Sequence, residues 1–374
     1  MTRLLYITDL EYKPGGGGSY AVNAHIQDQL KKHFDLCSPE PIVPKISFWQ
    51  RLLSRIQRYG LRRASRFFYF SPATLDSNAA RAAQYYSSDI DAVCFRSAAR
   101  WCHATPPVPY FVYLDIVFHT FFENTFAADD FLASDLERIY AAERQFLDKA
   151  EAVFFESEWG MQRALSAYSL GPENCHVIGR GGLVTPPSED TWPEGEFVLV
   201  SVALNFEQKG GDLILSAYVK LKQRYPNLRW HIVGGRPTGD WEHVDGITWE
   251  GVLDPGKASD LERFRDLLAR AFVLLHPTRE DTNPLVLTEA AYFGCPCISV
   301  RHFAIPELVI DGETGVLVDF PPRSHELEAA VSQLIESPDR YRKMRRAAFD
   351  FARTHFEWDV IGARMASMIR EHLH

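Results

Sequence analysis

The sequence predicts an α/β protein with two Rossmann-like domains, and three observations support this prediction. Short apolar runs alternate with helical patterns along the chain, which is typical of parallel α/β architecture. The 374 residues, 46% of them hydrophobic, are enough for two cores. The alternation also starts twice, each time with a hydrophobic strand, at 4–8 and again at 197–202.

The expected elements follow from the apolar periodicity of each segment. In the first half, strands are expected at 4–8, 92–95, 110–114, 152–156 and 175–178, and helices at 19–33, 75–85, 133–149 and 159–168. In the second half, strands are expected at 197–202, 230–233, 247–249, 272–276, 297–300 and 315–318, and helices at 211–224, 258–270, 284–293, 324–336, 338–354 and 358–373.

A proline-rich segment at 185–193 interrupts the alternation. Its three prolines cannot continue a helix or a central strand, so the segment is interpreted as a linker between domains. We therefore expect an N-terminal domain at 1–185, a C-terminal domain at 186–355 and a final helical segment at 356–374.

Composition and charge exclude several classes of protein. A formal net charge of -9 disfavours a general nucleic-acid binder. No apolar run approaches the about 20 residues needed to span a bilayer. Asp9 comes too early for a secretion signal, and none of the six cysteines has CxxC spacing, so buried reduced thiols are expected. These features predict a cytoplasmic protein.

The loop after the strand at 272–276 has the features of an anion site. Pro284 suits the first position of a helix, and Thr282 and Asn283 are good capping residues. The free N–H groups of Asn283, Leu285 and Val286 would then face a ligand. A helix N-terminus carries partial positive charge, which favours a diphosphate.

Two acids flank this helix start. Glu289 falls on the second turn, where its carboxylate could accept ribose hydroxyls, and Asp281 lies on the loop, where it could hold sugar hydroxyls. The alternative is a helix with ordinary loop acids, since two acids separated by seven residues are common by chance.

Lys209 follows the strand at 197–202 and precedes Gly210-Gly211 and a helix start. A lysine there can place a point charge on a departing diphosphate, and the glycines permit close approach of the backbone. The alternative is a solvated loop lysine.

Two features of the first domain also follow strands. The glycine loop with Gly16, Gly17 and Gly18 can bring backbone close to a ligand, although a flexible surface loop is the alternative. Asp115 is the first polar residue after the apolar run at 110–114, where functional groups of this sheet type often lie.

The segment 281–289 resembles the Glu-x7-Glu region of family 4 glycosyltransferases, which are retaining enzymes with the GT-B fold. The resemblance extends over 294–299 and 305–318, and 356–361 is similar to the start of the family's last helix. It implies two Rossmann-like domains facing a cleft, the first binding the acceptor and the second the nucleotide-sugar, with the last helix crossing back to the first domain.

The sequence departs from the family pattern at several positions. Asp281 stands in place of the first glutamate of the pair, and 282–284 read Thr-Asn-Pro instead of Gly-Phe-Gly. The arginine that usually precedes the lysine is missing, so Arg180 and Arg279 are candidates for its role. Only Asp115 matches the family's His-Asp pair, because Leu114 replaces the histidine; His119 could take its role, although packing among aromatics is the simpler interpretation.

The resemblance implies transfer of a sugar from a nucleotide-sugar to a hydroxyl of a glycan or lipid-linked acceptor, with retention and without a metal or other cofactor. The implied catalytic residues are Asp115, Lys209, Asp281 and Glu289. The implied donor-binding residues are Gly16, Gly17, Gly18, Lys209, Gly210, Asp281, Thr282, Asn283, Pro284, Leu285 and Glu289. The alternatives are a GT-B-like phosphorylase or epimerase, and a catalytically silent binding protein.

The segment 45–70 is basic and aromatic in an otherwise acidic protein. It contains seven lysines and arginines and no acid, interleaved with large apolar residues. This pattern predicts an interfacial amphipathic helix that meets anionic lipid at the inner face of the membrane. A core-packed helix with a solvated basic face, or recognition of an anionic acceptor, are the alternatives.

Overall fold

The computed structural model describes residues 1–46, 48–57, 64–190, 192–193 and 195–373. The chain forms two compact units. The first comprises Met1–Pro14, Ser19–Arg180 and Ile361–His374, and the second comprises Gly15–Gly18 and Gly181–Val360.

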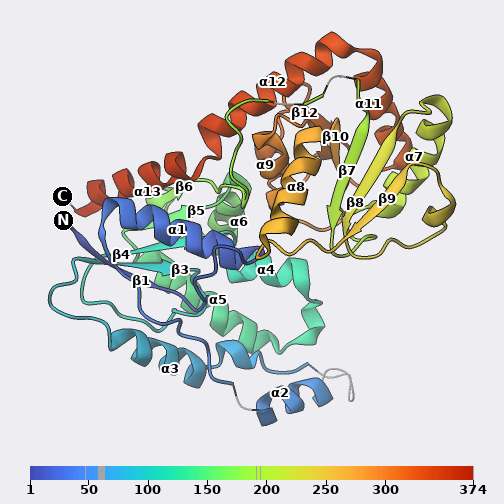
Figure 1. The fold of residues 1–374 in the computed structure, drawn as a ribbon. Helices are drawn as coiled ribbons and strands as arrows, with labels where there is room; N and C mark the ends of the chain where they lie inside the picture. Colours follow the sequence, from blue (N-terminus) through green and yellow to red (C-terminus); the bar gives the residue numbers. More distant parts are fainter. Residues whose placement is uncertain (47, 58–63, 191, 194, 374) are drawn as a thin grey trace. The chain divides into compact units, whose positions relative to one another are not determined.

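The first unit is built on a six-stranded parallel sheet in the order β2-β1-β3-β4-β5-β6 (Figure 1). Its strands are β1 (Arg3–Ile7), β2 (Asp35–Cys37), β3 (Ala92–Arg96), β4 (Tyr110–Leu114), β5 (Ala152–Phe155) and β6 (Cys175–Val177). Its α-helices are α1 (Ser19–His33), α2 (Phe48–Arg55), α3 (Pro72–Ala83), α4 (Phe118–Thr125), α5 (Ala133–Asp148) and α6 (Glu158–Tyr168), joined by most of α13 (Trp358–Leu373). Every residue of β3, β4 and β5 is buried, as expected for a sheet covered on both faces.

The second unit has the same architecture, with strand order β12-β11-β10-β7-β8-β9 (Figure 1). The strands are β7 (Val198–Ala203), β8 (Arg229–Gly234), β9 (Ile247–Gly251), β10 (Val273–His276), β11 (Cys297–Val300) and β12 (Gly315–Val318). The helices are α7 (Gly211–Arg224), α8 (Ala258–Arg270), α9 (Leu285–Tyr292), α10 (Ile305–Leu308), α11 (Ser324–Glu336) and α12 (Pro338–His355).

The two parallel sheets confirm the expected pair of Rossmann-like domains. Among the strands and α-helices of the described residues, three were not expected: β2, α4 and α10. The most consequential is α4, because the segment after β4 was expected to be a loop. Its sequence is dominated by aromatic residues, which pack into a small core of their own with Phe67 and Phe131. In the basic segment 45–70, the helix α2 covers Phe48–Arg55, and 58–63 lie outside the described residues.

The segment expected to be the linker groups with the second unit, and the boundary lies at Arg180 and Gly181. Two guanidinium nitrogens of Arg345, Nε and Nη2, each lie 2.6 Å from an oxygen of the Asp190 carboxylate. The centroid of the Trp192 ring lies 5.0 Å from that of the Tyr341 ring. These contacts hold the proline-rich segment against α12, so it is part of a packed domain.

The end of the chain belongs to the first unit from Ile361 onward. In that unit Arg364 donates to the carbonyl of Ile178, and Arg370 donates to the carbonyl of His33, each over 3.1 Å. All six cysteines are free thiols. None of the helices in the described ranges combines the length and apolar character needed to cross a bilayer.

Candidate functional site

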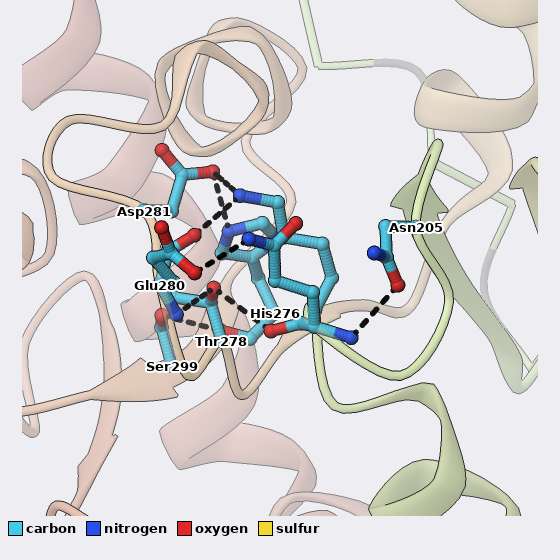
Figure 2. Close-up of polar contacts among 8 residues, drawn as sticks. Asn205, His276, Thr278, Glu280, Asp281 and Ser299 are labelled. Carbon is cyan, nitrogen blue, oxygen red and sulfur yellow. Dashed lines mark hydrogen bonds and ion pairs between the residues drawn. The ribbon is translucent and has the colours of Figure 1, made fainter. Parts of the chain in front are cut away.

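Two loops of the second unit meet at one edge of its sheet. One follows β7 and carries Lys209, and the other follows β10 and carries Asp281. Since β7 and β10 are paired and parallel, their carboxyl ends lie side by side. Lys209 Nζ lies 2.7 Å from Asp281 Oδ2 and 2.8 Å from the carbonyl oxygen of Glu280. Figure 2 shows this cluster, with the two contacts of Asp281 drawn as dashed lines.

Gly210 makes the approach of these loops possible. Its φ of 78° lies in the left-handed region, and a Cβ there would fall 2.2 Å from the carbonyl oxygen of Pro277. Gln208 adds two further links: its carbonyl accepts the N–H of Arg279 over 2.9 Å, and its Nε2 donates to Glu280 Oε2 over 2.6 Å. Lys209 is therefore held on a loop whose backbone is tied to the loop of Asp281.

His276 is the third member of this cluster. It ends β10, is 2% exposed, and its Nε2 lies 3.2 Å from Asp281 Oδ2. Burial raises the pKa of Asp281, but the hydrogen bond and charge of His276 and the charge of Lys209 outweigh burial, so this pKa falls to about 2. Asp281 is thus ionised at neutral pH. His276 was not among the predicted site residues, although a polar residue at the end of an apolar strand was a usable signal.

The helix start after Asp281 differs from the prediction by one residue. Pro284 is the N-cap, with extended backbone, and α9 begins at Leu285. The expectation that Pro284 opens the helix and that Thr282 and Asn283 cap it is therefore wrong. No side chain caps this helix. The backbone of Thr282 contacts a different loop, where its carbonyl accepts the N–H of Ala304 over 3.0 Å. Uncapped N–H groups at a helix start attract anions.

Glu289 lies on the second turn of α9 and is 6% exposed. Its Oε1 accepts the N–H of Leu183 over 3.0 Å, which fixes the carboxylate at the edge of a pocket of about 170 Å³. The remaining walls are largely apolar and include Val184, Val202, Val233, Leu253, Leu261 and Phe264. A buried carboxylate at the edge of an apolar pocket suits a ligand with both a flat apolar part and hydroxyl groups.

The two candidate arginines have other partners. Arg279 forms a two-point ion pair with Asp212, with both distances 2.7 Å, and so links the loop after β10 to α7. Arg180 belongs to the first unit, where it lies 3.1 Å from Glu156. Glu156 is shared with Arg96 at 3.0 Å, and all three side chains are largely buried.

The glycine loop precedes α1, and its residues Gly15–Gly18 group with the second unit. Gly18 has a φ of 55°, and a Cβ on Gly17 or Gly18 would have no heavy atom within 4 Å. These two glycines therefore have open space beside them. Gly16 forms a bend and is half-buried.

The first unit has its own pocket, of about 300 Å³, at the carboxyl ends of β1, β3 and β4. Asp115 lines it, as do Asp9, Arg96, Arg100 and Glu143. The pocket therefore combines charged groups of both signs with apolar walls, and it places the predicted Asp115 among groups that can bind hydroxyls or anions.

Glu143, one of the lining residues, connects the elements around this pocket. Its carboxylate accepts hydrogen bonds from the backbone N–H of Phe118 and from the hydroxyl of Tyr168. Burial raises the pKa of Glu143 to about 7 in spite of these bonds. Sequence reasoning missed this residue, because one acid on an amphipathic helix carries no signal of burial.

His119 is not a lining residue of this pocket. It lies on α4, where its ring packs 4.8 Å from the Tyr140 ring and its backbone N–H donates to the Tyr168 hydroxyl over 3.2 Å. The simpler interpretation, packing among aromatic rings, describes His119 in this structure.

A family model described as Glycosyl transferases group 1 matches residues 187–351. This stretch contains Lys209, Asp281, Glu289 and the loops that hold them. The chain carries a group 1 glycosyltransferase domain. The domain lies within the second unit, which is the unit expected to bind the nucleotide-sugar.

Two proteins similar to this chain are named as glycosyltransferases. D-inositol 3-phosphate glycosyltransferase of Corynebacterium glutamicum is 27% identical over 274 residues, covering 67% of this chain and 64% of the relative. GDP-mannose-dependent alpha-(1-6)-phosphatidylinositol monomannoside mannosyltransferase of Mycolicibacterium smegmatis is 29% identical over 188 residues, covering 46% of this chain and 47% of the relative. The matches thus span about half to two thirds of these relatives.

Solved structures match the fold over nearly the whole chain. Sucrose-phosphate synthase from Thermosynechococcus elongatus has a TM-score of 0.69 at 16% identity and covers 99% of each chain. The Anabaena protein HepE, solved in complex with UDP-glucose, has a TM-score of 0.65 at 17% identity and covers 99% of this chain and 100% of its own. These similarities confirm the expected GT-B fold class.

Proposed function

We propose that this protein is a retaining glycosyltransferase that moves a sugar from a nucleotide-diphosphate sugar to a hydroxyl of a glycan or lipid-linked acceptor, without a metal cofactor. The contact of Lys209 with Asp281 carries the proposal. It places a cation and an ionised carboxylate together, four residues before the uncapped start of α9.

Each part of the donor has a partner in the second unit. Lys209 and the first N–H groups of α9 bind the diphosphate. Glu289 accepts the ribose hydroxyls, and the apolar pocket beside it receives the base. Asp281 accepts hydroxyls of the transferred sugar. The GDP-mannose and UDP-glucose in the names of similar proteins support a nucleotide-sugar donor.

The chemistry follows from charge development on the leaving group. As the bond between the sugar and the diphosphate breaks, negative charge grows on the phosphate, where Lys209 and the helix dipole stabilise it. The acceptor hydroxyl attacks from the face that the phosphate leaves, and a phosphate oxygen takes its proton. This route retains the anomeric configuration and needs no nucleophilic side chain.

The acceptor binds in the pocket of the first unit, where Asp115 orients the attacking hydroxyl. The charged groups of this pocket, set among apolar walls, suit the hydroxyls of a glycan or the polar head of a lipid-linked acceptor. Contact of residues 45–70 with an anionic membrane surface belongs to the same proposal.

The proposal is tested by incubating the full chain with UDP-, GDP-, ADP- and dTDP-sugars in the presence of EDTA and measuring the melting temperature. A nucleotide-sugar that binds the native state should raise it. Transfer is then measured with that donor, and the product anomer is assigned by NMR. Asp281→Asn should lower the rate by about a hundredfold or more. An inverted anomer, or activity that disappears with EDTA, would contradict the proposal, and a requirement for inorganic phosphate would identify a phosphorylase.

A further inference from the structure

The helix α2 presents its apolar side to solvent. The exposed fractions are 69% for Phe48, 73% for Trp49, 49% for Leu53 and 47% for Ile56, which directly follows the helix. No residue of α2 is buried. Three large apolar side chains exposed on α2, with a fourth directly after it, are unusual for a surface that meets only water, because such patches mark interaction sites.

The polar side of the same helix faces the body of the first unit. Ser54 Oγ lies 3.1 Å from Ser65 Oγ, and Ser54, Arg51 and Arg55 line a pocket of about 270 Å³. In an ordinary surface helix the apolar stripe packs inward and the charged side faces water. In α2, Ser54 contacts the body of the unit while Phe48, Trp49 and Leu53 remain exposed, so this apolar side is open to an apolar environment.

The pocket behind α2 combines aromatic walls with a cationic rim. Phe67 and Phe131 stack at 4.4 Å between ring centroids, and Phe126 lies beside both. Arg51, Arg55 and Arg66 line the same pocket and are exposed. Within the described part of the chain, no carboxylate forms an ion pair with any of these three guanidinium groups. Among the described residues, the positive charge of this rim therefore has no carboxylate partner.

We propose that α2 docks on an anionic lipid surface and that the pocket behind it holds one phospholipid. The apolar face enters the boundary between head groups and acyl chains, Arg51, Arg55 and Arg66 bind lipid phosphates, and the aromatic walls receive an acyl chain. Arginine side chains beside an apolar face reach the phosphate level readily, because their stems lie along apolar surface. This inference rests on the proposed membrane contact and deepens it by naming the lipid site.

The docking is tested with the full chain and sedimented vesicles of phosphatidylcholine, with and without phosphatidylglycerol, in the absence of nucleotide-sugar. The protein should bind the anionic vesicles far more tightly than the neutral ones. Arg51→Gln with Arg55→Gln should weaken this binding about 30-fold. The matched control is Arg342→Gln with Arg346→Gln, which removes the same charge at the same spacing from the exposed face of α12 and should change nothing.

The apolar contribution is tested with Trp49→Ala and Leu53→Ala together, which should abolish vesicle binding while the arginines stay in place. Equal binding to neutral and anionic vesicles would overturn the proposal, as would vesicle binding that neither double variant weakens. Sedimentation velocity completes the test, since dimers that bury α2 and exclude vesicles would identify a second copy as its partner.

The pocket is tested separately with soluble dihexanoyl phosphatidylglycerol. Ser54→Phe fills the space behind α2, keeps all arginines, and should weaken binding of this lipid about tenfold or more. Glycerol phosphate and inorganic phosphate serve as competitors and should not displace the lipid. Unchanged affinity in Ser54→Phe, or displacement by free phosphate, would refute the pocket. The melting temperature and donor binding by the second unit verify that Ser54→Phe is folded. Because donor binding is measured separately, a failure of the lipid pocket is distinguished from a failure of the transferase proposal.

Discussion

The Nζ atom of Lys209 lies 2.7 Å from Oδ2 of Asp281, although 72 residues separate them in the sequence. Two parallel neighbouring strands bring their loops together, and Gly210 lets the loops touch. The result is a cation held beside a carboxylate whose pKa is lowered to about 2. The Asp281 carboxylate is therefore ionised across the physiological pH range.

Replacing Lys209 by methionine should reduce kcat for sugar transfer about 100- to 1000-fold, since the charge acts on the leaving group in the transition state. The pKa of Asp281 should rise in the same variant, because one of the cations that lower it is removed. Initial rates of nucleotide release measure the first effect. Lys220→Met, which removes an exposed lysine paired with Glu328, is the control and should leave the rate unchanged.

Replacing Glu289 by glutamine should weaken nucleotide-sugar binding about 10- to 100-fold, because hydrogen bonds to a charged acceptor are stronger than those to a neutral one. Glutamine keeps an oxygen for the N–H of Leu183, so the fold should be preserved. Calorimetric titration with the donor measures the effect, and Glu262→Gln on the exposed side of α8 is the control. Wild-type affinity in Glu289→Gln would remove this residue from the donor site.

Replacing Gly210 by alanine should destabilise the protein by at least about 1–3 kcal/mol, the usual cost of a strained backbone conformation. The φ of 78° is unfavourable for alanine, and its Cβ would clash with the carbonyl of Pro277. Urea unfolding measures the loss. Gly17→Ala provides the comparison, since a Cβ there meets no heavy atom within 4 Å. Equal stability of the two variants would mean that the loop relaxes without cost.

Glu143 should make stability depend on pH. Its pKa is raised from 4.5 to about 7, so between these values the folded protein binds more protons than the unfolded chain. The contribution is complete below pH 4.5 and is lost as pH rises through 7, at a cost of about 3 kcal/mol. In Glu143→Gln this loss should disappear. Urea unfolding at pH 5 and pH 8 gives the free energy of unfolding of both proteins at each pH. The same change with pH in the wild type and in Glu143→Gln would show that Glu143 does not titrate in this range.

The sequence was sufficient for most of the secondary structure, since the helices at 211–224, 258–270 and 324–336 have the predicted bounds. Prediction from the sequence was less accurate where one segment carried signals for two different structures. The aromatic residues of α4 gave no helical pattern, so the segment was predicted as a loop. The helix α9 was predicted to start at Pro284, one residue before its actual start at Leu285. The prolines at 185–193 indicated a linker, but Asp190 pairs with Arg345, which lies 155 residues away.

Apolar periodicity by itself determined the two α/β halves, because which residues enter a core depends on their spacing along the chain. It also placed Lys209, Asp281 and Glu289 beside strand ends or helix starts. Only the tertiary structure decided which groups meet. It joined Lys209 and His276 to Asp281, buried Glu143, and turned the apolar side of α2 outward. Lys209 meets Asp281 across 72 positions of the chain, and Glu143 meets Phe118 across 25. The periodicity of one segment carries no information about the partner that it will face.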